Sequence, residues 1–263
     1  MEYRQLPHGK EMISVIGMGT SSIGEADEQE IIDTVHLAIK SGINYFDLAS
    51  GHARTFKAFG KAIKGKREKV YLQIHFGANY ETGEYGWTTN LDKIKQSVAW
   101  QLKMLQTDYI DLYIIHRWDE ETPIEETMEA LHDLVKMGKV RYIGCSSCYA
   151  WQFAKAQHVA EVHGWTKFVS MQNKYNLLYR EEEREQIPQL MDMKVAMTSY
   201  QPLQGGRLAR NEGEVTTRSL TQVNKGTEIY SDACEKIISK RVEELAEKYG
   251  CSKANIALAW QFT

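Results

Sequence analysis

Short apolar segments alternate with segments of helical periodicity along the whole of this 263-residue sequence. Apolar runs rich in β-forming residues predict strands, and strands that alternate with helices predict a parallel sheet. The predicted strands cover residues 14–19, 44–49, 70–76, 110–116, 142–145, 168–172 and 195–200. We therefore expect an α/β fold of the TIM (β/α)8 barrel type, preceded by an N-terminal β-hairpin.

The number of predicted strands is seven, whereas a closed barrel of this type has eight. The last helical stretch, SKANIALAWQFT, runs to Thr263 without a Gly or Pro stop signal. We therefore expect a single barrel domain over residues 1–263 that is incomplete at its C-terminus and lacks the eighth βα unit. The edge strands of such an open barrel have unpaired backbone groups that need a partner. The partner could be a second copy of the chain in a homo-oligomer, a terminal segment packed over the gap, or the missing part of a longer protein of which this chain is a fragment.

Two predicted helices have clear start signals. Asp27 and Glu30 have the spacing of a capping box. Thr122 is expected to cap the second helix, with Pro123 at its first position and Glu125 bonding back to the cap. Further helices are predicted over residues 91–105 and 151–162. The irregular stretch at residues 204–228 is either a cofactor or substrate loop at the barrel mouth or a solvated connection.

Charge and composition limit the class of protein. Lys and Arg number 32 against 35 Asp and Glu, so the formal net charge of −3 gives no electrostatic reason to expect a nucleic acid or an anionic membrane as partner. No apolar run approaches the roughly 20 residues that cross a bilayer, and the first residues lack the apolar core of a secretory signal. A chain of 263 residues with only four Cys does not need disulfides for its stability. The reducing cytoplasm is therefore the expected compartment.

Ionisable side chains stand where several predicted strands end. Asp47 ends the segment NYFD, His75 ends YLQIH and His116 ends LYIIH, while His52 lies in the segment after Asp47. Barrel enzymes keep their chemistry at the C-terminal ends of the strands. A single His at such a position more often has a structural role. The shared position of these four residues nevertheless predicts that they meet at one pocket.

Two further motifs have competing interpretations. The segment GMGTSSIG at residues 17–24 follows a predicted strand, but its G-x-G-x4-G spacing departs from that of a Rossmann dinucleotide loop. Cys145 and Cys148 form a C-x-x-C motif, with Cys148 expected at a helix N-terminus that would lower the pKa of its thiol. Without a second Cys pair a structural zinc site is not favoured, so the motif fits either a redox pair or a small core residue at Cys145.

Several longer segments resemble the aldo-keto reductase family over essentially the whole chain. They are GINYFD, LQTDYIDLYIIHRWDEETPIEETMEALHDLVKMGKVRYIGCSS, VSMQNKYNLLYREEER and SYQPLQGG. The back half is most similar to the branch that includes bacterial reductases and potassium-channel beta subunits. The front half, with ASGHARTFKAFGKAI and YLQIHFGANYETGEYGW, resembles a more divergent branch. A recombined or engineered chain would explain this pattern.

The resemblance implies an oxidoreductase that transfers hydride from NADPH to an aldehyde or ketone. The Asp, Tyr, Lys and His on which the family relies correspond here to Asp47, His52, His75 and His116, so two of the four groups are replaced by imidazoles. A neutral imidazole supplies less positive charge to a developing oxyanion than a cation does. We therefore expect weak activity or none, with any activity rising below about pH 6.5, where more imidazole is protonated.

The resemblance also implies a set of cofactor-binding residues. Ser146 and Gln172 match residues that hold the nicotinamide carboxamide, and Tyr200 matches the aromatic ring that stacks on the nicotinamide. The full set is Thr20, Asp47, Ser146, Ser147, Gln172, Tyr200, Gln201 and Leu203. The segment after the eighth strand, which clamps the adenosine 2′-phosphate in the family, has no counterpart. We therefore expect weak NADPH binding with little preference over NADH.

Two alternatives to a reductase of small carbonyl substrates stay open at this point. A catalytically silent barrel would bind a nucleotide or a protein partner, as the channel beta subunits suggest. The four groups Asp47, His52, His75 and His116 would also suit Zn²⁺ or Fe²⁺. No metal is predicted, because the sequence does not fix the conformation of the segment that holds His52.

Overall fold

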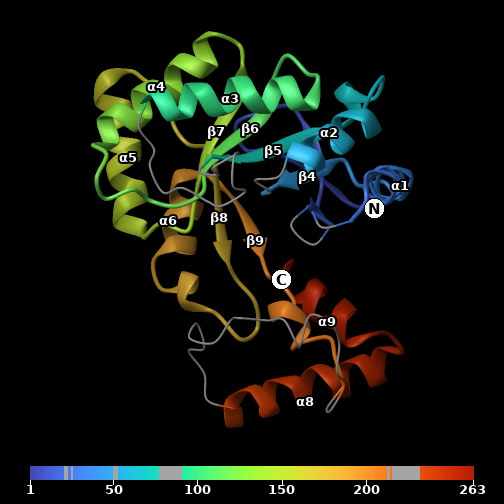
Figure 1. Cartoon of the computed structure of the whole chain (residues 1–263). Coiled ribbons are helices and arrows are strands. Elements are labelled where there is room, and N and C mark those ends of the chain that lie inside the picture. Colours follow the sequence, from blue (N-terminus) through green and yellow to red (C-terminus); the bar gives the residue numbers. More distant parts are fainter. Residues whose placement is uncertain (21–22, 25, 50–52, 77–90, 212–213, 215–231) are drawn as a thin grey trace. The chain divides into compact units, whose positions relative to one another are not determined.

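The computed structural model describes all of the chain except residues 21–22, 25, 50–52, 77–90, 212–213 and 215–231 (Figure 1). Contacts between residues divide the chain into two compact units. The first unit consists of Met1–Met171 and Met193–Ala196, and the second of Gln172–Asp192 and Met197–Thr263. The expectation of a single domain stays a prediction.

A parallel sheet with helices between its strands forms the first unit. Its strands are β3 (Met18–Gly19), β4 (Tyr45–Leu48), β5 (Tyr71–Phe76), β6 (Ile110–Ile115) and β7 (Val140–Ser146), joined by the first residues of β8 (Ser170–Lys174) and β9 (Ala196–Tyr200). In the described residues the sheet has seven strands in sequence order from β3 to β9. The α/β fold class is thus confirmed. A doubly wound Rossmann sheet would reverse its strand order at a switch point, whereas this order is typical of a TIM-type fold.

The helices of the first unit cover the sheet as amphipathic layers. They are α1 (Glu28–Lys40), α2 (Ala53–Ala62), α3 (Leu91–Leu105), α4 (Ile124–Lys136) and α5 (Ala150–His163), with a short 3-10 turn η1 (Arg67–Lys69) before β5. Each α-helix packs against the next one along the chain. Helix α1 begins as predicted, because the Asp27 side chain accepts the Glu30 N–H at 2.8 Å. Helix α3 has the predicted bounds.

The N-terminal β-hairpin is confirmed, and it packs on the inward side of the sheet. Strand β1 (Tyr3–Gln5) pairs antiparallel with β2 (Met12–Ser14). Leu6, in the turn between them, joins a buried cluster with residues of β4, β5 and β6, namely Tyr45, Tyr71, Leu112 and Ile114. Because these strands are buried on both faces, all six residues of β5 and all six of β6 are buried, as their apolar sequences predict.

The predicted strand over residues 14–19 is wrong. Ser14 is the last residue of β2, where it pairs with Tyr3, and β3 contains only Met18 and Gly19. The backbone N–H of Ser14 donates to Asn44 Oδ1 at 2.7 Å, so this part of the chain turns between hairpin and sheet. An apolar run does not distinguish one strand from two short strands separated by a turn.

The predicted cap of α4 is also wrong. Its N-cap residue is Pro123 rather than Thr122, and no side-chain cap hydrogen bond is present there. The Thr122 hydroxyl instead donates to Asp119 Oδ2 at 2.7 Å. A nearby carboxylate accepts a hydroxyl proton more strongly than a neutral backbone group could, so the local sequence D-E-E-T overrides the capping pattern.

The second unit has a small core of its own. It contains the rest of β8 and β9, most of α6 (Gln186–Met193), the short turns η2 (Glu181–Glu183) and η3 (Gln204–Gly206), and the helices α8 (Asp232–Tyr249) and α9 (Lys253–Trp260). The core residues are Leu178, Leu208, Val242 and Ala257. The predicted loop at residues 204–228 begins with η3, and most of it lies outside the described residues.

Candidate active site

Three of the predicted catalytic residues lie at the C-terminal ends of neighbouring strands. Asp47 is the third residue of β4, His75 is the fifth residue of β5, and His116 directly follows β6. The parallel register places Asp47 opposite Gln73, two residues before His75. The His116 N–H donates to the Phe76 carbonyl at 3.2 Å, which extends the ladder between β5 and β6 to the site. Backbone pairing alone therefore brings the three side chains to one edge of the sheet.

The three side chains touch in a line with His75 in the middle. Nε2 of His75 is 2.9 Å from Oδ1 of Asp47. Nδ1 of His75 is 2.7 Å from Nδ1 of His116, and the two rings meet edge to face with their centroids 4.9 Å apart. His75 is 4% exposed, so its ring is enclosed by the protein between these two neighbours. We call Asp47, His75 and His116 the Asp–His–His chain.

Hydrogen-bond chemistry restricts where the protons of this chain lie. Nε2 of His75 is within ion-pair distance of Asp47 Oδ1, and the carboxylate favours a hydrogen on that nitrogen, although the two atoms do not have hydrogen-bond geometry. When His75 is neutral, its Nδ1 accepts from His116, whose Nε2 then holds a lone pair. When His75 carries hydrogens on both ring nitrogens, its Nδ1 donates to Nδ1 of His116, and the hydrogen of His116 then lies on its Nε2. The protonation of His75 therefore decides whether Nε2 of His116 is a donor or an acceptor.

Electrostatics keep the outer imidazole neutral. Burial, the His75 ring and the Arg117 guanidinium together lower the pKa of His116 to about 3, and the Asp47 carboxylate only partly opposes them. A cation is favoured next to a carboxylate and disfavoured in an apolar setting. His116 is therefore neutral at physiological pH, and its contact with His75 is the route by which a proton would reach it.

Residues of neighbouring elements fix the position of the central imidazole. Gln101, buried in α3, donates from Nε2 to the His75 carbonyl at 3.0 Å. One residue pair further back on the same strands, the Tyr45 hydroxyl donates to Gln73 Oε1 at 2.5 Å. Sequence reasoning missed Gln101 and Gln73, although a Gln inside an otherwise apolar strand or helix stripe is the signal that would have found them.

The predicted cofactor residues of the first unit lie near the same strand ends. The Thr20 N–H and hydroxyl both donate to the Asp47 carbonyl, at 2.9 and 3.2 Å. Ser146 ends β7, and its hydroxyl is 3.3 Å from that of Ser147. Ser147 has a φ of 53°, a left-handed conformation that is uncommon for a residue other than Gly.

The remaining predicted residues fall into two groups. His52 lies outside the described residues. Gln172, Tyr200, Gln201 and Leu203 belong to the second unit. There, the Gln201 carbonyl accepts the Asn176 side-chain amide at 3.0 Å and the Gln204 N–H at 2.9 Å. These bonds fix the chain just after β9.

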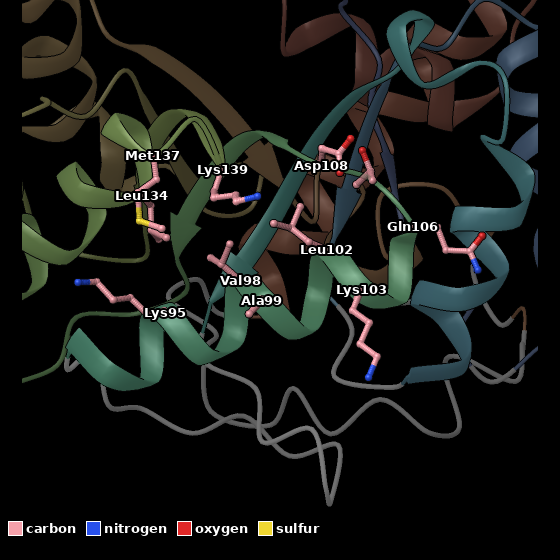
Figure 2. Close-up of a pocket in the computed structure, with 11 residues that line it drawn as sticks. Lys95, Val98, Ala99, Leu102, Lys103, Gln106, Asp108, Leu134, Met137 and Lys139 are labelled. Atoms are coloured by element: carbon pink, nitrogen blue, oxygen red, sulfur yellow. The ribbon is translucent and has the colours of Figure 1, made fainter.

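A cavity of about 510 Å³ lies elsewhere in the first unit, along α3 and α4 (Figure 2). Its apolar floor is formed by Val98, Leu102 and Leu134, and Lys95, Lys103 and Lys139 stand around it. None of the predicted catalytic or cofactor-binding residues that the structure describes lines it.

Two other classes of site were tested on the described part of the chain. It contains no group of three or more His, Cys, Asp or Glu residues arranged to hold a metal ion. It also contains no helix that is long and apolar enough to cross a membrane.

Comparison with known proteins gives consistent matches over the full length. A model of the family described as "Aldo/keto reductase family" matches residues 15–263. The aldo-keto reductase AMT2 of Alternaria alternata is 36% identical over 295 residues, covering 98% of this chain and 80% of that protein. The versiconal hemiacetal acetate reductase of Aspergillus parasiticus is 35% identical over 298 residues, with 100% and 86% covered. The aldo-keto reductase AFTS1 of A. alternata is 41% identical over 266 residues, with 89% and 72% covered.

Proposed function

The chain belongs to the aldo/keto reductase family, and from that premise we propose that it reduces the carbonyl group of small aldehydes or ketones with NADPH. The family membership supports an oxidoreductase that uses a nicotinamide cofactor. The observation that carries the proposal further is the Asp–His–His chain at the C-terminal ends of β4, β5 and β6. In a TIM-type fold, this edge is where substrates and cofactors bind.

The residues of the first unit are chemically suited to the cofactor. A nicotinamide carboxamide offers one acceptor and a pair of donors, and the adjacent hydroxyls of Ser146 and Ser147 can both donate and accept. We propose that they hold the carboxamide, that Thr20 and Asp47 border the ring, and that Gln172, Tyr200, Gln201 and Leu203 take the roles that the family resemblance gives them. The bound cofactor would supply the hydride.

The Asp–His–His chain would supply the proton. As hydride reaches the carbonyl carbon, negative charge develops on the oxygen and requires a donor. With His75 protonated on both nitrogens, Nε2 of His116 carries the hydrogen and donates it to the oxygen. Nδ1 of His116 then takes the hydrogen of His75 Nδ1, and His75 stays bound to Asp47 through Nε2. The net change is one proton moved from His75 to the product alcohol, with His116 neutral before and after.

This arrangement predicts a slow enzyme. In the family, a Lys occupies the position of His75 and a Tyr that of His52, so a permanent cation and the usual proton donor are both replaced. Because the proposed proton comes from imidazole groups, we expect the rate to rise below about pH 6.5, where more imidazole is protonated. We also propose that NADPH binds weakly and with little preference over NADH, and that the protein is cytoplasmic, as its four free thiols suggest.

A catalytically silent nucleotide-binding or protein-interaction module is the second candidate. The observation that favours it is the low pKa of His116, which keeps this ring from acting as a cationic donor by itself. The two candidates differ in turnover, whereas both allow the nucleotide to bind.

The test is NADPH oxidation with a panel of aldehydes and ketones between pH 5.5 and 8. We expect slow turnover that increases toward acid pH, and faster turnover at pH 7 in the double variant His52→Tyr/His75→Lys. His158→Ala, on the exposed face of α5, is the control and should match the parent protein. Bound NADPH without turnover in either the parent or the double variant would favour the silent module.

A further inference from the structure

The C-x-x-C motif brings two thiols into contact at the end of β7. Cys145 is the last residue but one of that strand, and Cys148 follows two residues later, before the N-cap of α5 at Tyr149. Sγ of Cys145 is 3.0 Å from Sγ of Cys148. Cys148 therefore lies directly before the N-cap residue of the helix.

The backbone between the two thiols is shaped so that they face each other. A disulfide requires Cβ–Sγ bonds that converge, and residues whose side chains point apart cannot be bridged without moving the backbone. Here Ser147, between the two cysteines, has a left-handed φ of 53°, and the two Sγ atoms lie 3.0 Å apart. The reduced protein thus already has the side-chain directions that a bridge needs.

The surroundings of the two sulfurs differ in access. Cys145 is fully buried, and burial together with the neighbouring thiol raises its pKa. Cys148 is 6% exposed, and its Sγ lies 3.9 Å from Sδ of Met171. No third metal-binding side chain completes a site around this pair within the described residues. Cys148 is consequently the sulfur that a small solute would reach first.

We propose that Cys145 and Cys148 form a modification site, a dithiol that a hydroperoxide converts reversibly to an intrachain disulfide. The Cys148 thiolate attacks the peroxide oxygen, the O–O bond breaks, and Cys148 becomes a sulfenic acid while water or an alcohol leaves. The Cys145 sulfur then attacks the Cys148 sulfur, the S–O bond breaks, and hydroxide takes the Cys145 proton and leaves as water. In total, the two thiols are oxidised by two electrons and lose two hydrogens, and one hydroperoxide is reduced. A thiol reductant converts the disulfide back to the two thiols.

The two residues enclosed by the bridge make this site relevant to the cofactor. Ser146 and Ser147 are the only residues between the two cysteines in the sequence. Shortening the Sγ–Sγ distance to the about 2.05 Å of a disulfide must shift this short segment. On the proposed function, which this step rests on, the shift would misplace the hydroxyls that hold the carboxamide and weaken nucleotide binding.

The experiment uses the full chain with Cys234→Ser and Cys251→Ser, which removes the other two thiols. After treatment with hydrogen peroxide and denaturation, we expect intact-mass analysis to show a loss of two hydrogens and no alkylation at Cys145 or Cys148. Dithiothreitol should restore both alkylation sites. The same protein with Cys148→Ala is the matched control and should form no intrachain bridge. Thiols that stay fully alkylatable, or that gain oxygen without bridging, would overturn the proposal.

A nucleotide titration followed by Trp fluorescence tests the link to the cofactor separately. We expect the oxidised protein to bind NADPH roughly tenfold more weakly than the reduced protein, the effect of losing about one hydrogen bond. Equal affinity of the two forms would refute that link. Absence of binding in both forms would count against the proposed function, and the mass measurement would still decide whether the disulfide forms.

Discussion

In the first unit, a carboxylate lies at each end of the parallel strands: Asp111 is buried at the N-terminal end, and Asp47 is half-buried at the C-terminal end. The two carboxylates have different partners. At the N-terminal end, Asp111 accepts from Arg67 Nη2 at 2.7 Å, from Arg141 Nη1 at 3.2 Å and from the Leu72 N–H at 2.9 Å. At the C-terminal end, Asp47 faces the Nε2 of His75 at 2.9 Å. One carboxylate is held by two guanidinium groups and a backbone amide, and the other contacts an imidazole.

Aromatic packing strengthens this difference. The guanidinium groups of Arg67 and Arg141 each lie 3.9 Å from the centre of the Tyr109 ring. Arg67 also donates to the carbonyls of Val70 and Tyr109, at 2.8 and 2.9 Å. A guanidinium stays charged at every physiological pH, so the two cations of this Arg–Asp–Tyr cluster are permanent.

The comparison shows how one sheet separates stability from chemistry. The Arg–Asp–Tyr cluster pairs a carboxylate with two permanent cations, and it ties η1, β5, β6 and β7 together where the strands begin. The Asp–His–His chain uses groups that exchange protons, where the strands end. Substitutions at the first end should therefore change the free energy of unfolding, and those at the second should change turnover.

The largest expected effect is that of Asp111→Ala. Removal of the carboxylate leaves Arg67 without its partner and the buried Leu72 N–H without an acceptor, so we expect the free energy of unfolding to fall by about 3–5 kcal/mol. Urea unfolding followed by circular dichroism measures this. Asp111→Asn, which keeps an acceptor, should lose less. Asp47→Asn is the matched change at the other end and should cost under about 1 kcal/mol. Equal losses at both ends would break the comparison.

Next in size is the effect of His116→Ala on turnover. In the proposed mechanism His116 donates to the developing oxyanion, so its loss should reduce kcat/KM by roughly 10²–10³. The free energy of unfolding should change little, because His116 is only half-buried. Steady-state kinetics and urea unfolding on the same preparation separate the two quantities. An unchanged kcat/KM would remove His116 from the proposed mechanism.

A smaller effect is expected on the pH dependence of stability. The pKa of His116 is lowered to about 3, below the roughly 6.5 of an unfolded His. Between these values the unfolded chain binds the proton more strongly, so stability is complete above about pH 6.5 and decreases as the pH falls toward 3. From pH 7 to pH 5 we expect His116 to contribute a loss of roughly 1–2 kcal/mol, after allowance for solvent screening. The difference in urea midpoint between the parent and His116→Gln isolates this contribution, and an unchanged difference at the two pH values would contradict it.

The sequence was sufficient for the strand order and for the meeting of Asp47, His75 and His116. Both follow from strand periodicity, because parallel strands end at a common edge. The line of contacts through His75 could not be predicted, since it depends on which ring nitrogen faces which neighbour. The role of Gln101 was missed because only packing of α3 on β5 brings its amide to the His75 carbonyl.

The Arg–Asp–Tyr cluster was missed for a related reason. Arg67, Tyr109, Asp111 and Arg141 come from separate segments whose individual patterns indicate exposed loops and strand starts. Charged residues there are ordinarily solvated, and only the register between β6 and β7 shows that they converge. The Thr122 cap failed because a nearby carboxylate, Asp119, competes for the hydroxyl.

The smallest effect that sharpens the comparison is that of Tyr109→Leu. This change keeps the Tyr109 carbonyl that accepts from Arg67 and removes only the ring that contacts both guanidinium groups. Cation–π contacts at partly exposed positions contribute about 0.5–1 kcal/mol each, so we expect the free energy of unfolding to fall by roughly 1–2 kcal/mol, with turnover unchanged. Unlike the loss of an ion pair, this loss should persist in high salt, because it rests on contact area as well as charge. If the loss of unfolding free energy disappeared in high salt, the Tyr109 ring would serve only to orient the two arginines toward Asp111. The stability of the N-terminal end of the strands would then depend on the ion pairs alone.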